Sequence, residues 1–226
     1  MKIPWIEPPP HALVTDRRPM PRESENLNRE RKNVVMIEPG TLEDLQDLGA
    51  YLRGHFLLTT KRHSDTFFIL ARLTEHPQRL KPWVAILQDK MKDIDAHTIV
   101  GPAMGGIIPA YALASMRDDA RVIFAEKSET GIMVFRRGFR LEAGEQVIII
   151  EDAMTTGSSI LKVRDAVLEQ GAHVSAVATL VNRSFDGQTP FRIPFFSVVD
   201  IPGIETWLPE ECRLCRQGVP LSLPKQ

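Results

Sequence analysis

The chain is poor in cysteine, with only Cys212 and Cys215 among its 226 residues. Two thiols exclude the multi-bridge framework that stabilises small secreted domains. Spaced as Cys-x-x-Cys, they supply only half of the ligands of a tetrahedral zinc site. A structural or incidental role is therefore favoured, and metal binding and redox chemistry stay open as alternatives.

The chain also lacks long apolar runs and an excess of charge of either sign. No apolar run approaches the roughly 20 residues that span a bilayer, and residues 1–20 have no apolar core of a signal peptide. With 28 basic and 29 acidic residues the net charge is −1, which favours neither nucleic acids nor membrane surfaces as partners. We expect a cytoplasmic protein that binds neither nucleic acid nor membrane.

The length suits one large core with a smaller cap. Residues 1–40 show little periodicity and are rich in Pro, Arg, Glu and Asn, which is typical of an extended or partly disordered arm. We expect an N-terminal helix and hood elements over 41–96, an α/β core over 97–203 and a C-terminal tail over 204–226. The helix starts at Thr41, which is a good N-cap residue.

Within the α/β core, short apolar runs alternate with segments of helical periodicity. Strands are predicted at 98–100, 121–125, 146–150, 173–181 and 195–199, helices at 77–94, 107–116 and 158–170, and a hairpin arm at 132–135. Such alternation is typical of right-handed βαβ units. The predicted fold is therefore α/β, with a central, mostly parallel sheet flanked by helices. Ligands of such sheets bind in the loops beyond the carboxyl ends of the strands.

The most informative of these loops follows the strand at 146–150. Two carboxylates, Glu151 and Asp152, come directly after the strand, and a loop of small polar residues then leads into a helix. Free N–H groups at a helix start, together with hydroxyls, bind phosphate. Adjacent residues of a strand point to opposite sides, so at least one carboxylate can meet the hydroxyls of a sugar. The segment predicts a site for a phosphorylated sugar.

Other residues at the same sheet edge suit the rest of such a ligand. The glycine-rich turn 101–106 permits close approach of backbone N–H groups to a diphosphate. Lys127, Arg136 and Arg137 are candidate cations for a departing diphosphate. Arg183 follows the strand at 173–181, where a guanidinium can bind a carboxylate.

The chain resembles the type I phosphoribosyltransferases, and within them the branch that acts on orotate. The resemblance rests on the segment that matches their binding motif for phosphoribosyl diphosphate (PRPP), Glu151-Asp152-Ala153-Met154-Thr155-Thr156-Gly157-Ser158-Ser159. It extends to other pieces between about residues 42 and 222: Gly54 to Leu58, Arg62 to Asp65, Pro102 to Gly106, Phe124 to Lys127, Arg136 to Gly138, Val181 to Arg183 and Cys212 to Leu221.

The resemblance implies transfer of ribose 5-phosphate from PRPP to N1 of orotate, with Mg²⁺ as cofactor and a homodimer as the assembly. It implies that PRPP contacts residues 151–159, Lys127 and the turn residues Ala103, Met104 and Gly105. It also implies that Thr155 and Arg183 bind orotate and that Phe67 and Phe68 border it. The candidate catalytic residues are Asp152, Lys127 and Arg137, with Glu151 and Asp152 as candidate Mg²⁺ ligands.

The chain departs from the better-known branch at several cationic positions. Thr59 and Gly105 replace lysines, and the mobile loop has Glu126, Thr130 and Ile132 where that branch has Arg, Lys and His. Lys127, Arg136 and Arg137 are the expected substitutes. Two alternatives stay open: a salvage phosphoribosyltransferase for another base, since Lys61 and Asn182 replace a usual Gly and Asp, and a non-catalytic regulator that binds PRPP.

Overall fold

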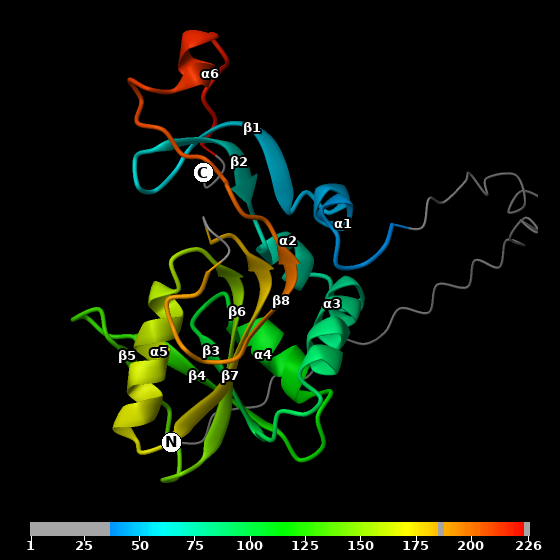
Figure 1. Ribbon diagram of the computed structural model, residues 1–226, viewed down its shortest axis with the longest axis vertical. Coiled ribbons are helices and arrows are strands. Elements are labelled where there is room, and N and C mark those ends of the chain that lie inside the picture. Colours follow the sequence, from blue (N-terminus) through cyan, green and yellow to red (C-terminus); the bar gives the residue numbers. More distant parts are fainter. Residues whose placement is uncertain (1–36, 185–187, 224–226) are drawn as a thin grey trace, which may run out of the picture. The chain divides into compact units, whose positions relative to one another are not determined.

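The computed structural model describes residues 37–184 and 188–223 (Figure 1). The arm predicted over 1–40 therefore lies outside the described residues except for its last four. In chain order the elements are α1 Leu42–Asp47, β1 Tyr51–Leu57, β2 His63–Phe68, α2 Ala71–Thr74, α3 Pro77–Lys90, β3 Thr98–Pro102, α4 Ile107–Ala114, β4 Arg121–Lys127, β5 Met133–Phe135, β6 Gln146–Met154, α5 Ser158–Glu169, β7 His173–Asn182, β8 Phe195–Asp200 and α6 Arg213–Arg216. None of these helices is long and apolar enough to cross a membrane.

The core is a six-stranded sheet in the order β5-β4-β3-β6-β7-β8. Each pair from β4 to β8 is parallel, and β5 at the edge is antiparallel to β4. This confirms the mostly parallel sheet and the hairpin arm that the sequence predicts. The arm forms because Gly131, with φ of 83°, closes a tight turn after β4.

Helices cover both faces of the sheet, with α3 and α4 on one side and α5 on the other (Figure 1). The strand β6 shows how the sequence builds these layers, because its side chains alternate between the faces. Ile148 and Ile150 pack into the cluster that contains α3 and α4, whereas Val147 and Ile149 pack into the cluster that contains α5. The helix α3, assigned from the sequence to the hood segment, thus packs on the sheet.

The strand β6 is longer than the sequence predicts. Its ladder with β7 continues past Ile150, through Glu151 opposite Thr179 to Met154 opposite Asn182. The prediction ended the strand too early because it took the carboxylates as the end of the apolar run. Backbone pairing needs no apolar side chains, so the carboxylates lie inside the strand and inherit its alternation.

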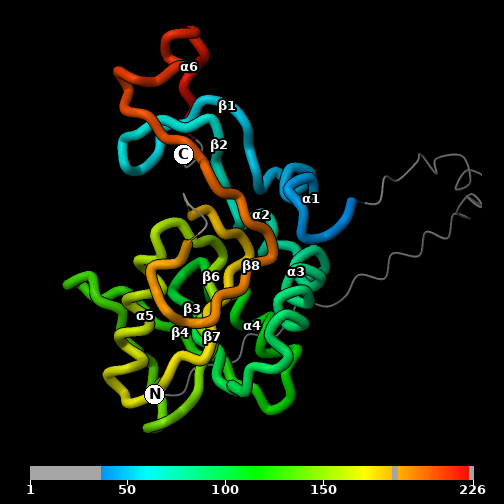
Figure 2. Tube along the Cα trace, in the orientation of Figure 1, coloured from blue at the N-terminus to red at the C-terminus, as the bar shows by residue number. Residues whose placement is uncertain are grey.

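A separate two-stranded hairpin, β1 with β2, lies above the carboxyl ends of the parallel strands (Figure 1). The segment 204–223 runs along it (Figure 2). The backbone of Trp207 exchanges two hydrogen bonds with that of His63 at 2.8 and 2.9 Å, and Ser222 bonds to the backbone of the opposite strand at His55 and Leu57. The mixed pattern over 54–73 thus resolves into a hairpin whose two edges are both covered by the C-terminal segment.

A buried carboxylate fastens α1 to the layered core. Thr41 caps α1 as predicted, because its Oγ1 accepts the backbone N–H of Asp44 at 3.2 Å. The side chain of Asp44, only 2% exposed, accepts from Trp83 Nε1 at 2.5 Å and from Arg79. A buried carboxylate without such donors is costly, so α1 and α3 are locked to each other.

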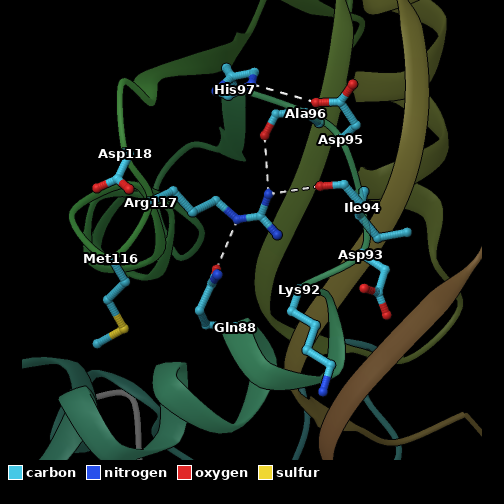
Figure 3. Close-up of a pocket in the computed structure, with 10 residues that line it drawn as sticks. All are labelled: Gln88, Lys92, Asp93, Ile94, Asp95, Ala96, His97, Met116, Arg117 and Asp118. Atoms are coloured by element: carbon cyan, nitrogen blue, oxygen red, sulfur yellow. Dashed lines mark hydrogen bonds and ion pairs between the residues drawn. The ribbon is translucent and has the colours of Figure 1, made fainter.

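A second polar side chain, the half-buried Arg117, links the segment after α4 to the segment that precedes β3 (Figure 3). The guanidinium of Arg117, after α4, donates to the carbonyls of Met91, Ile94 and Ala96 at 2.7 to 3.1 Å. Burial lowers the pKa of Arg117. The hollow of about 350 Å³ around it precedes β3 in the chain and therefore lies at the amino ends of the parallel strands, away from the predicted ligand loops.

Removing the Asp44 carboxylate should destabilise the fold. We expect Asp44→Ala to lower the free energy of unfolding by about 2–3 kcal/mol, because Trp83 Nε1 and Arg79 lose a charged acceptor. Urea unfolding followed by tryptophan fluorescence measures this. Asp47→Ala is the matched control, since Asp47 is exposed on the same helix and also bonds Arg79. Equal losses for both variants would contradict this role of Asp44.

Candidate active site

The predicted ligand loops meet where the chain order of the sheet reverses. From β3 the chain moves to β4 on one side, and it returns to β6 on the other side of β3. At such a switch point the loops after two neighbouring strands diverge and leave a crevice. Here these are the 102–106 loop after β3 and the 155–159 loop after β6.

Glycine brings the 102–106 loop against the acidic pair. A Cβ on Gly105 would lie 2.6 Å from Asp152 Oδ2, and one on Gly106 would lie 2.7 Å from the carbonyl oxygen of Ile150. The contact at Gly106 is with backbone and excludes a side chain there, whereas a side chain at position 105 would require the Asp152 carboxylate to move aside. The backbone of this loop, including the cis bond between Ala103 and Met104, therefore lies directly beside the carboxylate.

The side chains of Glu151 and Asp152 point to opposite faces of β6, so each lies beside a different loop. Asp152 follows Ile148 and Ile150 on the face covered by α4 and meets Gly105. Glu151 lies on the opposite face, where the Ser159 hydroxyl at the start of α5 donates to it. Alternation along one strand thus places one carboxylate beside each loop, as the sequence predicts for adjacent strand residues.

Both carboxyl groups are held partly out of water. Burial raises the pKa of Glu151 to about 7, with a further increase from the charge of Asp152 and a decrease from the Ser159 hydrogen bond. Burial also raises the pKa of Asp152, although the backbone N–H of Ala153 donates to Oδ1 at 2.7 Å. Burial thus disfavours the charged form of both carboxyl groups, and a bound cation or cationic ligand would offset this cost.

The 155–159 loop has the geometry of an anion site. Gly157, the residue before α5, adopts a left-handed conformation with φ of 70° and has no side chain to cap the helix. The Thr156 hydroxyl accepts the first N–H of the helix, that of Ser158, at a long 3.4 Å. The hydroxyl residues Thr155, Thr156 and Ser158 are exposed around the helix start. Uncapped N–H groups at the positive end of a twelve-residue helix favour a phosphate.

Arg183 lies across the crevice, directly after β7. Its guanidinium carbon lies 4.4 Å from the centroid of the Phe68 ring, and its backbone N–H donates to Met154 at 2.7 Å. The side-chain Nε is buried and has no hydrogen-bond partner among residues 37–184 and 188–223. Burial lowers the pKa of Arg183. A stacked, desolvated cation with a free donor suits a planar anion.

Asn182 contributes to this arrangement, although the sequence marked it only as an unusual residue. Its amide donates to Asp200 Oδ1 at 2.7 Å and its side-chain oxygen accepts the backbone N–H of Ser184 at 3.1 Å. These two bonds hold the turn that carries Arg183 against β8. No local pattern identifies this role, because Asp200 comes from a different strand.

The structure separates other predicted residues by environment. Phe68 lies against Arg183 and Tyr51, whereas the buried Phe67 packs against Phe56. Arg137 makes an ion pair with Glu126 at 2.9 Å, so its charge is already balanced within the β4–β5 arm. Lys127 is exposed at the end of β4 beside Gly131. Their proposed catalytic contacts stay predictions.

Another departure from the family pattern lies in the left-handed turn of the hairpin, and nothing in the structure explains it. Lys61 has φ of 63°, a conformation that favours glycine. The usual glycine of the family therefore fits the backbone better than the lysine present here, and the side chain of Lys61 is exposed.

Comparison with known proteins identifies the family. A family model described as phosphoribosyl transferase domain matches residues 70–202. An orotate phosphoribosyltransferase of Thermoanaerobacter sp. (strain X514) is 41% identical over 84% of this chain and 97% of its own length. The chain belongs to the orotate phosphoribosyltransferase family. A further member, from Thermotoga maritima, is 40% identical over 80% of this chain and 95% of its own length.

Solved structures show the same phosphoribosyltransferase fold. The crystal structure of orotate phosphoribosyltransferase from Aeropyrum pernix superposes with a TM-score of 0.59 at 23% identity, over 70% of this chain and 92% of that one. The Mycobacterium tuberculosis enzyme in complex with PRPP gives a TM-score of 0.52 at 23% identity, over 74% and 92%. The matched family model covers both loops and the acidic pair.

The raised pKa of Glu151 predicts a pH dependence of stability. Between the ordinary carboxyl pKa and about 7, the folded state retains a proton that the unfolded state releases, so stability falls as pH rises. Glu151→Gln removes this loss. Relative to wild type, we expect its stability to increase by on the order of 1–3 kcal/mol between pH 5 and 8.

Differential scanning calorimetry without Mg²⁺ or substrate at several pH values measures this difference. Glu169→Gln, on an exposed position of α5, controls for the loss of one negative charge. A Glu151→Gln difference that does not change with pH would show that this carboxyl titrates normally in the folded protein.

Proposed function

We propose that this chain transfers the 5-phosphoribosyl group of PRPP to N1 of orotate, producing orotidine 5′-monophosphate and diphosphate. The family and the names of its relatives support this activity. The observation that carries the choice of acceptor is Arg183, a half-buried arginine whose guanidinium lies over Phe68 and whose buried Nε has no partner among the described residues. Such a group suits a flat base that carries a carboxylate.

Different parts of PRPP are assigned to different loops of the crevice. We assign the 5′-phosphate to the 155–159 loop, because the start of α5 offers N–H groups and hydroxyls. The diphosphate faces the 102–106 loop, whose glycines allow backbone N–H groups to approach closely. Glu151 and Asp152 lie between the two loops and accept hydrogen bonds from the ribose hydroxyls.

The acidic pair also acts on the transition state. As the bond between C1′ and the diphosphate oxygen breaks, positive charge develops on the sugar ring, and carboxylates in a partly buried site stabilise it. The electron pair of the broken bond leaves with the diphosphate, N1 of orotate bonds to C1′, and the proton of N1 passes to the departing diphosphate. Arg183 and Phe68 orient the base during this step.

The acidic pair fits Mg²⁺ as the cofactor. Hard cations prefer carboxylate oxygens, and the cost of burial, which raises the pKa of both Glu151 and Asp152, would be offset by a bound cation. PRPP would hold the ion, with Glu151 or Asp152, which lie on opposite faces of β6, as a further ligand. Bound there, Mg²⁺ neutralises charge that develops on the departing diphosphate. A cytoplasmic location stays a prediction of the sequence.

We propose that the working unit is a homodimer. Three large apolar side chains are exposed along one side of α4 and the loop before it: Met104 at 83%, Ile108 at 48% and Tyr111 at 66%. The spacing of three residues places Ile108 and Tyr111 on one face of α4, and Met104 precedes them in the loop. Exposed apolar faces of this kind mark protein interfaces, and Met104 would bring the interface to the 102–106 loop. Lys127 then reaches PRPP of the neighbouring subunit.

The activity is tested by mixing the purified chain with PRPP, Mg²⁺ and orotate and following the loss of orotate absorbance. Turnover with orotate supports the proposal, and Asp152→Asn is the negative control. Turnover with another base alone would assign a salvage enzyme. Calorimetric binding of PRPP without turnover on any base would assign a regulator.

Arg183 should determine the affinity for orotate. We expect Arg183→Ala to raise the orotate KM by roughly tenfold or more, since a charged hydrogen bond contributes about 1.5–3 kcal/mol. The KM for PRPP should change much less. Arg72→Ala, an exposed arginine on α2, is the control for general loss of charge. An unchanged orotate KM would remove Arg183 from the base site.

The apolar face on α4 predicts the assembly state. We expect Tyr111→Arg to shift a dimer to monomers, because a charge at the centre of an apolar interface must be desolvated. Sedimentation velocity measures the change. Leu168→Arg, half-exposed on α5, is the matched control and should leave the dimer intact. A wild-type chain that sediments as a monomer at high concentration would exclude the dimer.

A further inference from the structure

Four metal-ligating side chains converge at the hairpin, outside the crevice. His55 of β1 and His63 of β2 meet Cys212 and Cys215, which come from the start of α6 and from within it. One ligand atom from each lies within 4.8 Å of all the others. We propose that these residues form a structural zinc site that fastens the C-terminal segment to the hairpin. This inference does not depend on the proposed function.

The distances within the cluster fit a tetrahedral ion. Cys212 Sγ and Cys215 Sγ lie 3.4 and 3.7 Å from His55 Nε2, and Cys215 Sγ lies 3.3 Å from His63 Nδ1. Usual zinc bond lengths give sulfur–nitrogen edges of about 3.6 Å and nitrogen–nitrogen edges of about 3.3 Å. The two histidine nitrogens are 2.9 Å apart. These four of the six edges thus lie within about 0.4 Å of the tetrahedral values, so small shifts along them suit the coordination of Zn²⁺.

The hydrogen bond on the far side of His55 selects the tautomer that binds metal. Its Nδ1 lies 2.8 Å from the carbonyl oxygen of Val219. A carbonyl only accepts, so Nδ1 carries the proton and Nε2 presents its lone pair to the cluster. Metal-binding histidines are typically oriented by such a carbonyl acceptor on the other ring nitrogen. Val219 belongs to the same C-terminal segment as the two cysteines.

The donor set and its burial favour zinc over harder cations. Two thiolates and two imidazoles form a Cys₂His₂ set, which Zn²⁺ binds as a closed structural site, whereas Mg²⁺ and Ca²⁺ prefer oxygen. Cys212 is fully buried, and His55 and His63 are 2% and 5% exposed. Three of the four ligands are thus enclosed, and the fourth, Cys215, lies at the surface. With four protein ligands no position is left open for substrate.

The C-terminal segment has little else to hold its short helix in place. Cys212 is the one buried residue between 202 and 223, and α6 has only four residues. The hairpin is a two-stranded sheet, which is marginally stable alone. Segments without an adequate apolar core are commonly stabilised by a metal. The zinc would replace the missing core.

Metal analysis of the full chain tests the site. The protein is purified without a histidine tag, in reducing buffer without chelator, after growth with zinc. We expect about one equivalent of zinc per chain by mass spectrometry of the metal. Cys215→Ser and His63→Asn should each lower the zinc content by roughly tenfold or more, since each removes one of four ligands.

Matched controls separate this site from other metal binding. Gln217→Ser beside α6 and His97→Asn at the other end of the core are exposed, non-ligating substitutions and should retain the zinc. Asp152→Asn should retain it as well, which excludes binding at the acidic pair. Loss of zinc in any of these three variants at wild-type levels of folding would overturn the assignment.

Cobalt reports the geometry directly. We expect the protein loaded with Co²⁺ to show the intense visible bands of a tetrahedral ion and a thiolate-to-cobalt charge-transfer band, which Cys215→Ser weakens. Chelation should also lower the Tm of wild type but not that of Cys215→Ser. Two results on the wild-type protein would overturn the proposal even if the variants fail to fold. One is that, after incubation with Zn²⁺, the protein binds no metal and both thiols still react with a thiol reagent. The other is a cobalt spectrum typical of octahedral coordination.

Discussion

The approach of the Gly105 backbone to the Asp152 carboxylate is the constraint on which the crevice depends. A Cβ there would lie 2.6 Å from a carboxylate oxygen and would displace the Asp152 side chain from its present position. Because the loops that follow β3 and β6 flank the switch point of the sheet, their contact brings the proposed diphosphate loop and the proposed sugar-binding carboxylate to one place. The sheet fixes the positions of the two loops, and the absence of a side chain at Gly105 lets its backbone approach the Asp152 carboxylate.

The pairing of β6 with β7 continues through Glu151 and Asp152, so these two residues keep the alternation of the strand. Alternation sends Asp152 toward α4 and Glu151 toward α5. Burial then raises the pKa of both groups, so the ligand-free crevice is electrostatically unfavourable. A cation or a developing positive charge relieves that cost, which is the property a site for an oxocarbenium-like transition state needs.

Most of the sheet and one half of the site could be predicted from the sequence, since they depend on local patterns. Apolar runs such as Val147 to Ile150 locate buried strands, and the segment 151–159 marks the candidate sugar-phosphate site without any long-range information. The end of β6, the role of Asn182 and the partners of Cys212 depend on residues distant in the chain. The sequence shows that the two cysteines are close to each other in the chain, but His55 and His63 come near them only in the folded structure.

The C-terminal segment covers both edges of a hairpin that is synthesised much earlier. Arg62 in the hairpin loop donates to Thr206, 144 residues farther along, and Ser222 completes the opposite edge. A nascent chain therefore carries unpaired strand edges throughout translation of the core. The hairpin carries Phe68, which lies against Arg183, so a chain that lacks the C-terminal segment would have the sheet and its loops but a hairpin with both edges unpaired beside Arg183.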